Sequence, residues 1–354
     1  MSSRQLVSNK DRLSGYLQRF GLEGESAFSA IAHHYVILHS IRGKSLPVSI
    51  KAKWELQYNK IKSVSYLVEF LNELVRTDPL GSLLPEWYQF FVGRRFREGS
   101  GKFFTPKPIA HAMAELLPKT KNPVIMDPTA GAGTFLMEAS KIWADVECTL
   151  VANDVEPSLV ELAMLTLGLG ASPRHSQYYL SENIFDERDG LKAWYGKVDY
   201  ILANPPFSLR IDNEQFESLL FAQGYKTSDA LFIDTALKLL RPGGRLVCLL
   251  PHSIVANNEF SALRRLVEQY WSVFAVVSLP EGVFQLSGGT STRADIVVLD
   301  KKPISKDKLK AVVFASVPSV GIRLNNNAKD VIDNDLEKLL GNSDVKKALG
   351  LDYA

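Results

Sequence analysis

The spacing of apolar residues divides the chain into two parts. Between about residues 10 and 98, apolar positions recur three and four residues apart, as in "ESAFSAIAHHYVILHSI" and "VSYLVEFLNELV", and no run alternates like a half-buried strand. This spacing predicts a helical bundle. The stretch "VGRRFREGSGKFFTP" then breaks the pattern with charge, glycine and proline. We therefore expect a helical N-terminal domain over residues 1–98.

The pattern of the second part predicts an α/β fold. Amphipathic helical segments alternate with the apolar runs "VIMDP", "TLVANDV", "VDYILANPP", "GGRLVCLLP" and "VFAVVSLP". Such alternation is typical of a doubly wound, mainly parallel sheet, whose ligands lie at the carboxyl ends of its strands. The runs "ADIVVLD" and "LKAVVFASV" follow. We expect the second domain over residues 99–318 and a polar tail over 319–354, poorly ordered from Asn325.

Composition adds few constraints. With 46% hydrophobic and 23% charged residues the chain is an ordinary globular protein, and its net charge of +2 neither demands nor excludes nucleic acid. The two cysteines have no metal-ligand spacing and suit a reducing cytosol. No signal-like or membrane-length apolar stretch is found. We expect a cytoplasmic protein with no membrane partner and no metal site.

A glycine-rich loop follows the first predicted strand, in "DPTAGAGTF". Its small residues Ala130, Gly131 and Gly133 let the backbone turn tightly and approach a ligand. The loop lacks the G-x-G-x-x-G spacing of dinucleotide binders, so it does not indicate a bound pyrophosphate. Tight turns also need glycine for structural reasons, so the loop alone is a candidate cofactor site only.

Asp154 ends the second predicted strand, where a carboxylate can accept hydrogen bonds from both hydroxyls of a ribose. Asp127 ends the first strand. Two carboxylates at consecutive strand ends suit a nucleoside with a positive centre, such as a sulfonium. The alternative is that Asp154 caps the helix that begins near Pro157.

The apolar run "ILANPPFS" stops at Asn204, Pro205, Pro206 and Phe207. An exocyclic amine is a poor nucleophile because its lone pair is delocalised into the ring, and acceptors that favour a tetrahedral nitrogen activate it. The Asn204 side chain and the Pro205 carbonyl supply two such acceptors, and the prolines bring no competing N–H. Phe207 offers a face for stacking a base, worth about 1–3 kcal/mol. These four residues predict a binding site for a planar amine.

The motifs "GKFFTP", "DPTAGAGTF", "ANDVEP" and "LANPPF" occur in the order and spacing of N6-adenine DNA methyltransferases. Over residues 76–315 the chain most resembles the modification subunit of type I restriction-modification systems. The resemblance implies a Rossmann-like class I S-adenosylmethionine-dependent methyltransferase fold with a seven-stranded, mainly parallel sheet. It also implies site-specific, adenine-specific DNA methylation with S-adenosylmethionine as cofactor.

The resemblance assigns roles to individual residues. Contacts to the methionine part of the cofactor are implied for Phe104, Thr105 and Pro106. The floor of the cofactor pocket is implied for Asp127, Ala130, Gly131 and Gly133. Asp154 would hold the ribose, Asn204 and Pro205 would receive the target amine, and Phe207 would stack on a flipped adenine.

One position departs from the family pattern. In "SENIFD", Asn183 stands where relatives often carry an acidic residue that contacts the adenine of the cofactor. An amide can hydrogen-bond there with less charge assistance, which predicts weaker cofactor binding. Asp186 is the alternative contact if the register differs.

DNA is the partner that the resemblance implies, and a specificity subunit and a restriction subunit are implied as further partners. Only about 40 residues follow the last predicted strand, fewer than a domain usually needs, so we expect sequence choice to come from a separate subunit. A standalone enzyme is the alternative. A basic stretch before the "GKFFTP" motif could touch a nucleic-acid backbone or be a solvated linker: Arg94, Arg95, Arg97 and Lys102.

Two other functions remain open from the sequence. An enzyme that methylates a protein glutamine or an exocyclic amine of RNA would also use an Asn-Pro-Pro turn. A non-catalytic subunit that binds cofactor or DNA within an assembly is the second alternative, although the intact Asn204 to Phe207 segment argues against it. Neither cysteine follows a proline in a nucleophile loop, which argues against methylation at a cytosine carbon.

Overall fold

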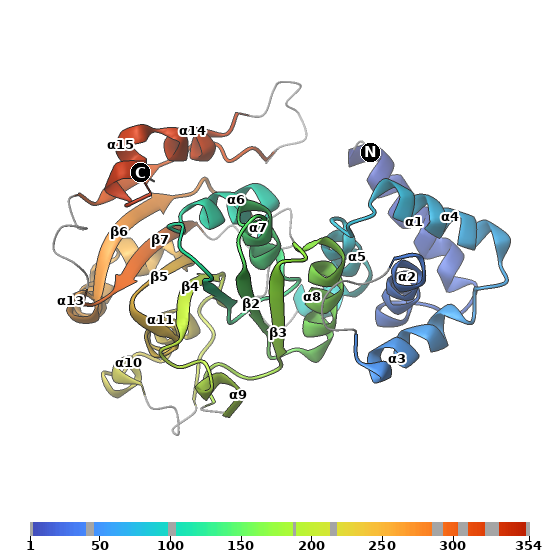
Figure 1. The fold of residues 1–354 in the computed structure, drawn as a ribbon, viewed down its shortest axis with the longest axis horizontal. Coiled ribbons are helices and arrows are strands. Elements are labelled where there is room, and N and C mark those ends of the chain that lie inside the picture. Colours follow the sequence, from blue (N-terminus) through green and yellow to red (C-terminus); the bar gives the residue numbers. More distant parts are fainter. Residues whose placement is uncertain are drawn as a thin grey trace.

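Helices alone make up the first part of the described chain, as the three- and four-residue spacing of its apolar positions predicts. The computed structural model describes residues 3–39, 46–97, 104–186, 189–212, 218–284, 293–303, 311–322 and 333–351. The helices of this first part are α1 (Ser3–Gln18), α2 (Glu25–Leu38), α3 (Val48–Tyr58), α4 (Ser65–Thr77) and α5 (Leu84–Arg97) (Figure 1). The domain boundary expected at residues 98 and 99 lies outside the described residues.

Strands and helices alternate in the second part, which confirms the α/β class. The strands are β1 (Val124–Asp127), β2 (Cys148–Asn153), β3 (His175–Leu180), β4 (Val198–Ala203), β5 (Leu240–Pro251), β6 (Trp271–Ser278), β7 (Ala294–Lys301) and β8 (Val313–Ser316). The helices around them are α6 (Lys107–Glu115), α7 (Thr134–Ile142), α8 (Pro157–Gly170), α9 (Asp189–Lys192), α10 (Leu219–Ala222), α11 (Ser228–Leu239), α12 (His252–Ala256), α13 (Ser261–Tyr270), α14 (Asp335–Gly341) and α15 (Ser343–Ala348). A short 3-10 helix spans Asn258–Phe260.

The strands form one sheet in the order β3-β2-β1-β4-β5-β7-β6-β8. Among the described strands only β7 runs against the others, so the sheet is mainly parallel, as expected. It has eight strands where seven were expected, because Val313–Ser316 pairs with β6 at the edge. The strand order reverses between β1 and β4. The carboxyl ends of these two strands therefore frame the crevice where such sheets bind ligands.

Successive residues of the central strands bury their side chains on opposite faces of the sheet. Ile125 and Tyr200 pack in one apolar cluster with α6 and α7, whereas their neighbours Met126 and Ile201 pack in another with α11. Both faces of the sheet are therefore covered by helices, which makes it the middle of three layers. Strands buried on both faces have nearly continuous apolar sequences. This explains why the central strands appear in the sequence as apolar runs.

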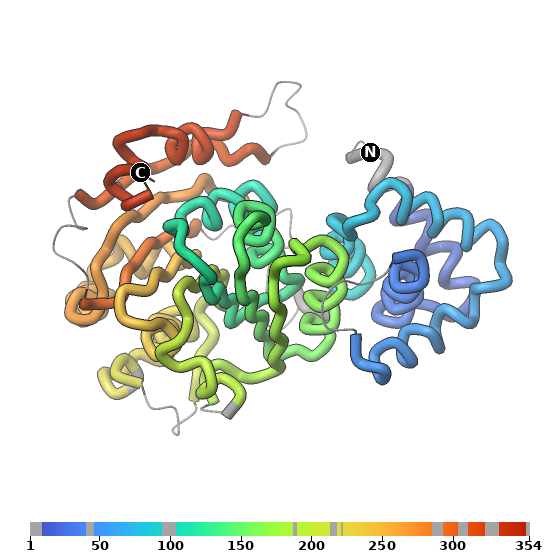
Figure 2. The backbone as a smooth tube through the Cα atoms, in the orientation of Figure 1, coloured from blue at the N-terminus to red at the C-terminus, as the bar shows by residue number. Residues whose placement is uncertain are grey.

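Helix α8 joins the helical part to the sheet. Its Ala163 and Leu167 pack in the core of the sheet, while Leu162 and Leu165 pack with buried residues of the N-terminal helices, including Trp87. A helix that is apolar on all sides is buried on all sides. The N-terminal helices therefore dock on α8, and Figure 2 shows their backbone beside it.

Residues 333–351 pack on the main core instead of forming a loose tail. Leu336 of α14 is buried in the same apolar cluster as α6. The buried guanidinium group of Arg245 in β5 donates to the carbonyl of Leu349 at 2.8 Å, which attaches the end of this segment to the sheet. The expectation of poor order is therefore wrong for these residues, and residues 323–332 lie outside the described part.

Candidate active site

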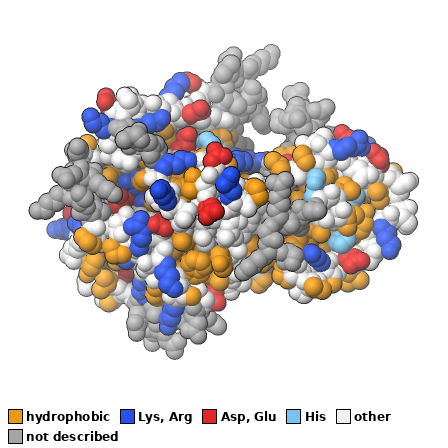
Figure 3. Space-filling view, in the orientation of Figure 1, with side chains coloured by type: hydrophobic (Ala, Val, Ile, Leu, Met, Phe, Trp, Pro, Cys, Tyr) orange, Lys and Arg blue, Asp and Glu red, His pale blue; other side chains and the backbone are white. Residues whose placement is uncertain are grey.

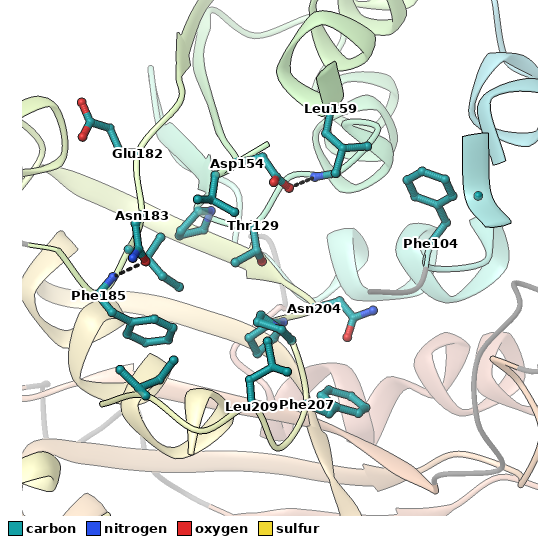
Figure 4. Close-up of a pocket in the computed structure, with 18 of the residues that line it drawn as sticks. Phe104, Thr129, Asp154, Leu159, Glu182, Asn183, Phe185, Asn204, Phe207 and Leu209 are labelled. Carbon is teal, nitrogen blue, oxygen red and sulfur yellow. Dashed lines mark hydrogen bonds between the residues drawn. The ribbon is translucent and has the colours of Figure 1, made fainter. Parts of the chain in front are cut away.

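A cavity of about 270 Å³ lies where β1, β2, β3 and β4 end. Its lining comes from the segments that directly follow these strands, from Phe104 and from one side of α5. The predicted site residues that line it are Phe104, Gly131, Asp154, Asn183, Asn204, Pro205, Pro206 and Phe207 (Figure 4). The predicted site residues outside its lining are Thr105, Pro106, Asp127, Ala130 and Gly133.

The loop after β1 brings bare backbone against the ring of Phe104. Gly131 has a φ angle of 52°, in the left-handed region that glycine adopts at little cost. A Cβ atom placed on Gly131 would lie 3.5 Å from the Phe104 ring. The absence of a side chain at Gly131 therefore keeps open the space between the loop and this ring.

Ala130 and Gly133 support the loop from outside the cavity. The amide of Ala130 donates to the carbonyl of Asn153 at 2.7 Å, which joins the end of β1 to the end of β2. Gly133 has a φ angle of 77°, and a Cβ atom placed on it would lie 3.3 Å from the Cβ atom of Ala163 in α8. Gly133 therefore allows α7 and α8 to approach each other closely.

Asp127 lies beneath the loop and does not face the cavity. Its side chain is fully buried, and its Oδ1 accepts a hydrogen bond from the amide of Thr129 at 2.9 Å. Its Oδ2 is buried with no hydrogen-bond partner among the described residues. Burial raises the pKa of Asp127 well above its ordinary value, and the nearby carboxylate of Asp154 raises it further. Asp127 shapes the loop from below.

Asn153, which the sequence motifs did not single out, ties the loop after β1 to the loop after β3. Its Nδ2 donates to the carbonyls of Pro128 at 2.8 Å and Glu182 at 3.0 Å, and its Oδ1 accepts from the amide of Glu182 at 3.0 Å. The side chain is fully buried. A polar residue at the end of an apolar strand is the signal that could have revealed it, because buried amides need partners.

Asp154 binds both the glycine-rich loop and the turn before α8. Its Oδ2 accepts from the amide of Gly131 at 3.0 Å, and its Oδ1 accepts from the amide of Glu156 at 3.0 Å. The second bond joins Asp154 to Glu156, the N-cap residue of α8, so Asp154 closes the turn before this helix and is not its cap. A carboxylate offers about four acceptor positions, so these bonds are compatible with acceptance from a ligand in the cavity that Asp154 lines.

Asn183 lines the cavity, whereas Asp186 is not part of the lining. The Oδ1 of Asn183 accepts from the amide of Phe185 at 3.1 Å, as the dashed line in Figure 4 shows. The backbone carbonyl of Asn183 accepts from the amide of Asp186 at 3.0 Å. These bonds close a tight turn after β3. The turn holds Asn183 and its neighbour Glu182 in the cavity wall.

The side chain of Asn204 is oriented by Thr105. The Nδ2 of Asn204 donates to the Oγ1 of Thr105 at 3.2 Å. Thr105 is buried, and the next residue, Pro106, is the N-cap residue of α6. Because the amide nitrogen is directed at Thr105, the amide oxygen of Asn204 points away from it. Thr105 and Pro106 thus belong to the support of the site and not to its lining.

Phe207 closes the turn after β4. Its ring is half-buried and meets the ring of Phe284 edge-on, with ring centroids 6.4 Å apart. The residue also lines the cavity. Figure 4 shows Asn204 and Phe207 on the same side of the cavity. An aromatic ring therefore stands next to the amide group of the turn.

Helix α5 supplies a wall of the cavity that the sequence motifs did not predict. Tyr88, Gln89 and Gly93 line the cavity from this helix. The hydroxyl of Tyr88 donates to the Oγ of Ser158 in α8 at 3.0 Å, and its ring meets that of Phe104 edge-on at 6.3 Å. Docking of the N-terminal helices on α8 therefore completes the cavity. No local sequence pattern reveals this contact, because it depends on packing between distant segments.

The charged side chains in the described lining are the carboxylates of Asp154 and Glu182, with no lysine or arginine. A phosphate site would need cationic or clustered N–H donors, whereas carboxylates favour a ligand with positive charge. No group of three His, Cys, Asp or Glu residues in the described ranges is placed to hold a metal ion. The predicted basic stretch cannot be placed, since these side chains lie outside the described ones: Arg94, Arg95, Arg97 and Lys102.

The fold matches those of solved methyltransferase structures. A type I restriction-modification methyltransferase subunit from Streptococcus thermophilus superposes with a TM-score of 0.62 at 18% identity, over 92% of this chain and 74% of that one. A protein from Listeria monocytogenes described as a class I S-adenosylmethionine-dependent methyltransferase superposes with a TM-score of 0.56 at 17% identity, over 88% of this chain and 94% of that one. These likenesses establish the class I methyltransferase fold.

Sequence comparison then gives the family. Residues 82–348 match the N-6 DNA Methylase family, and the chain belongs to it. The type II methyltransferase M.VspI of a Vibrio species is 26% identical over 211 residues, 57% of this chain and 49% of that protein. The methylase subunit of the type I restriction enzyme MjaVII of Methanocaldococcus jannaschii is 28% identical over 294 residues, 75% of this chain and 49% of that protein. The chain spans about half the length of these relatives.

Proposed function

We propose that this chain transfers a methyl group from S-adenosylmethionine to the N6 amine of adenine in DNA, as part of a restriction-modification system. The observation that carries the proposal is the position of Asn204 and Pro205 at the end of β4, in the wall of a cavity whose charged lining is acidic. A binding site for an amine and a binding site for a cationic nucleoside thus share one cavity. Membership of the N-6 DNA Methylase family supports the proposal.

Two oxygen atoms would receive the target amine. The Oδ1 of Asn204 and the carbonyl of Pro205 would accept its two N–H groups, which favours a tetrahedral nitrogen with a localised lone pair. The same oxygens stabilise the positive charge that develops on this nitrogen during transfer. The carbonyl of Pro206 accepts from the hydroxyl of Ser228 at 2.6 Å, so it has a structural role. Amide and carbonyl oxygens are weak bases, so the proton passes to water.

The charge of the cavity lining and its bare loop backbone suit S-adenosylmethionine. When bound, this cofactor supplies an electrophilic methyl group on a sulfonium centre. The carboxylates of Asp154 and Glu182 match its positive charge, and the bare backbone of Gly131 leaves room beneath the ring of Phe104. Asp154 would accept from the ribose hydroxyls, and Asn183 would hydrogen-bond the adenine. Phe104 would enclose the methionine part.

Phe207 would hold the target base. A base that is stacked inside a DNA duplex cannot reach the cavity at the end of β4. The adenine would therefore have to be flipped out of the DNA double helix. Stacking on an aromatic ring is worth about 1–3 kcal/mol per base. Phe207 lines the cavity next to Asn204 and is braced by Phe284, which suits it to this role.

The positions of the two cysteines favour methyl transfer to an amine over methyl transfer to a cytosine carbon. Methylation at cytosine carbon needs a thiolate nucleophile. Cys148 and Cys248 are both buried, and neither lines the cavity. Burial raises the pKa of Cys148 to about 11, and burial also raises the pKa of Cys248.

DNA is the proposed macromolecular substrate, and separate specificity and restriction subunits are the proposed partners, as in the type I systems that the motifs resemble. On the face seen in Figure 3, Lys and Arg side chains are spread among acidic ones and do not form one large patch. No helix in the part of the chain that the structure describes is long and apolar enough to cross a membrane.

Calorimetric titration with S-adenosylmethionine, followed by transfer of a tritium-labelled methyl group, tests the proposal. The acceptors are unmethylated DNA, RNA of the same sequences and an unmodified protein mixture. Cofactor binding with label in DNA is the expected result. Label in RNA or protein in preference to DNA would support the other methyl acceptors. Cofactor binding with no transfer to any acceptor would indicate that the specificity subunit is needed, and no transfer after that subunit is added would support a non-catalytic subunit.

A further inference from the structure

Two buried polar residues at the start of α11 contact the backbone of the turn after β4. Ser228 is fully buried and Asp229 is 3% exposed. Neither lines the cavity, and neither belongs to a motif to which the sequence gave a role. Buried polar side chains generally have hydrogen-bond partners, and here partners of both side chains lie in residues 206–209.

Ser228 is bonded to the turn on both sides of Phe207. Its hydroxyl donates to the carbonyl of Pro206 at 2.6 Å and accepts from the amide of Leu209 at 3.2 Å. Its own amide donates to the carbonyl of Leu209 at 2.8 Å. One small side chain thus fixes the backbone immediately before and shortly after the ring that lines the cavity.

Asp229 secures the residue that follows Phe207. Its Oδ2 accepts from the amide of Ser208 at 3.2 Å, and its Oδ1 accepts from the amide of Ala230 at 2.9 Å. Ser208 has a φ angle of 56°, in the left-handed region that residues other than glycine seldom adopt. Such a conformation persists only where surrounding contacts hold it. The carboxylate of Asp229 provides one of these contacts.

The helix that carries this pair is itself firmly packed. Ala230, Leu231 and Phe232 are fully buried in the apolar cluster beneath β4 and β5. The hydroxyl of Thr235, two turns along α11, contacts the carbonyl of Ile184 in the cavity wall at 3.4 Å. Helix α11 is therefore a rigid support against which the turn can be fixed.

We infer that Ser228 and Asp229 are positioning residues for methyl transfer: through the backbone of residues 206–209 they hold Phe207 and the acceptor oxygens before it in the geometry that receives the amine. This inference rests on the proposed function, because the positioning concerns the acceptor of that reaction. The pair touches neither base nor cofactor. Its effect on rate therefore comes through the pre-organised turn.

Substitutions in the pair should lower the rate without lowering cofactor affinity. Ser228→Ala removes the donor to Pro206 and the acceptor for Leu209. Asp229→Asn replaces one carboxylate oxygen with an NH2 group. An NH2 group cannot accept the hydrogen bond that the amide of Ser208 donates to Asp229. We expect each to slow transfer at saturating cofactor and DNA about tenfold, with cofactor affinity near that of the wild type. Ser228→Thr keeps the hydroxyl and should keep most of the rate.

Matched controls come from buried residues away from the turn. Ser140→Ala removes a hydroxyl that is 1% exposed and accepts from the amide of Ser172 at 2.9 Å. Asp234→Asn alters a buried carboxylate of α11 that accepts from the amide of Leu220 at 2.8 Å. These variants make the same chemical changes and should lower thermal stability while leaving the transfer rate of the folded protein unchanged.

Hydrogen exchange measured by mass spectrometry on the peptide over residues 205–211 gives a readout that needs no activity. Faster exchange in Ser228→Ala and Asp229→Asn, but not in the two controls, together with the slower transfer, is the expected result. Exchange equal to that of the controls, or faster exchange with an unchanged transfer rate, would overturn the inference. A wild type that stays inactive with the specificity subunit present would contradict the proposed function instead, and the exchange would still decide whether the pair holds the turn.

Discussion

The side-chain nitrogen of Asn204 donates to the hydroxyl of Thr105 at 3.2 Å, across 99 positions of sequence. This bond connects the end of β4 to the start of α6. The oxygen and nitrogen of an amide lie on opposite sides of one planar group, so fixing the nitrogen also fixes the oxygen. The orientation of the proposed amine acceptor therefore depends on a residue that does not line the cavity.

Thr105→Val should slow methyl transfer with little change in cofactor affinity. The substitution keeps the shape of the side chain but removes the acceptor for Asn204, and one such hydrogen bond is worth about 0.5–1.5 kcal/mol. A reduction of roughly threefold to tenfold at saturating substrates is expected, and Thr105→Ser should recover most of it. Thr166→Val is the control, since the buried Thr166 donates to the carbonyl of Leu162 within α8 and does not line the cavity. Equal effects at Thr105 and Thr166 would contradict the orienting role.

Asn204→Ala should abolish methyl transfer and leave cofactor binding near that of the wild type. The substitution removes one of the two proposed acceptors of the amine, whereas the groups proposed to hold the cofactor, such as Asp154 and Asn183, stay in place. Single-turnover transfer and calorimetric titration of S-adenosylmethionine measure the two properties separately. Loss of cofactor binding in this variant would show that the role assigned to Asn204 is wrong.

Alanine substitutions at the two glycines of the loop after β1 should change different properties, cofactor binding at Gly131 and thermal stability at Gly133. Gly131→Ala forces an alanine into a left-handed conformation, at about 1–2 kcal/mol, and places a methyl group beside Phe104. It should weaken cofactor binding about tenfold. Gly133→Ala places its methyl group against Ala163 instead and should mainly lower the melting temperature. Titration calorimetry and thermal unfolding distinguish these outcomes, and a reversed pattern would refute the assignment.

Asn153→Ala should destabilise the fold and weaken cofactor binding together. It leaves the carbonyls of Pro128 and Glu182 and the amide of Glu182 without their partner, and each buried group left unpaired costs about 1–3 kcal/mol. We expect a loss of about 3 kcal/mol or more in the free energy of unfolding, measured by urea titration. A loss below about 0.5 kcal/mol, typical of surface changes, would mean that Asn153 does not hold the loops.

The N-terminal helices should lose stability as the pH falls below about 6.5, the ordinary pKa of histidine. Burial lowers the pKa of His34, and burial also lowers the pKa of His33. Below the ordinary pKa the unfolded chain binds protons that the folded chain does not, so the free energy of unfolding decreases with falling pH. Melting temperatures between pH 8 and pH 5 should show this decrease. His34→Gln should reduce the slope, and an unchanged slope would exclude His34 as its source.

The part of the site that could be predicted from the sequence is the part carried by strand ends. Asn204 to Phe207 and Asp154 follow a strand directly, Gly131 lies in the loop after β1, and parallel strands bring such residues to one edge. Asp127, the last residue of β1, is fully buried beneath the loop and does not line the cavity, so its role stays a prediction. A one-residue difference in position along a strand decides which side a side chain faces.

The residues that sequence analysis missed act through tertiary packing. Tyr88 reaches the cavity because α5 docks on α8, and Ser228 reaches the turn because α11 begins beside it. No local sequence pattern predicts either contact.

A local pattern was present for helix α14. Asn334 is its N-cap and accepts from the amide of Glu337, and the buried Leu336 and Leu340 are four residues apart. The preceding asparagine-rich stretch concealed this signal.

Asn204 is proposed to receive N6 of an adenine in DNA. The most direct measurement is transfer of a labelled methyl group from S-adenosylmethionine to unmethylated DNA, followed by digestion and mass-spectrometric identification of the labelled nucleoside. We predict N6-methyldeoxyadenosine from the wild-type protein and none from Asn204→Ala. Label in N4-methyldeoxycytidine or 5-methyldeoxycytidine, or unmodified DNA from a preparation that binds the cofactor and DNA, would contradict methylation at N6 of adenine.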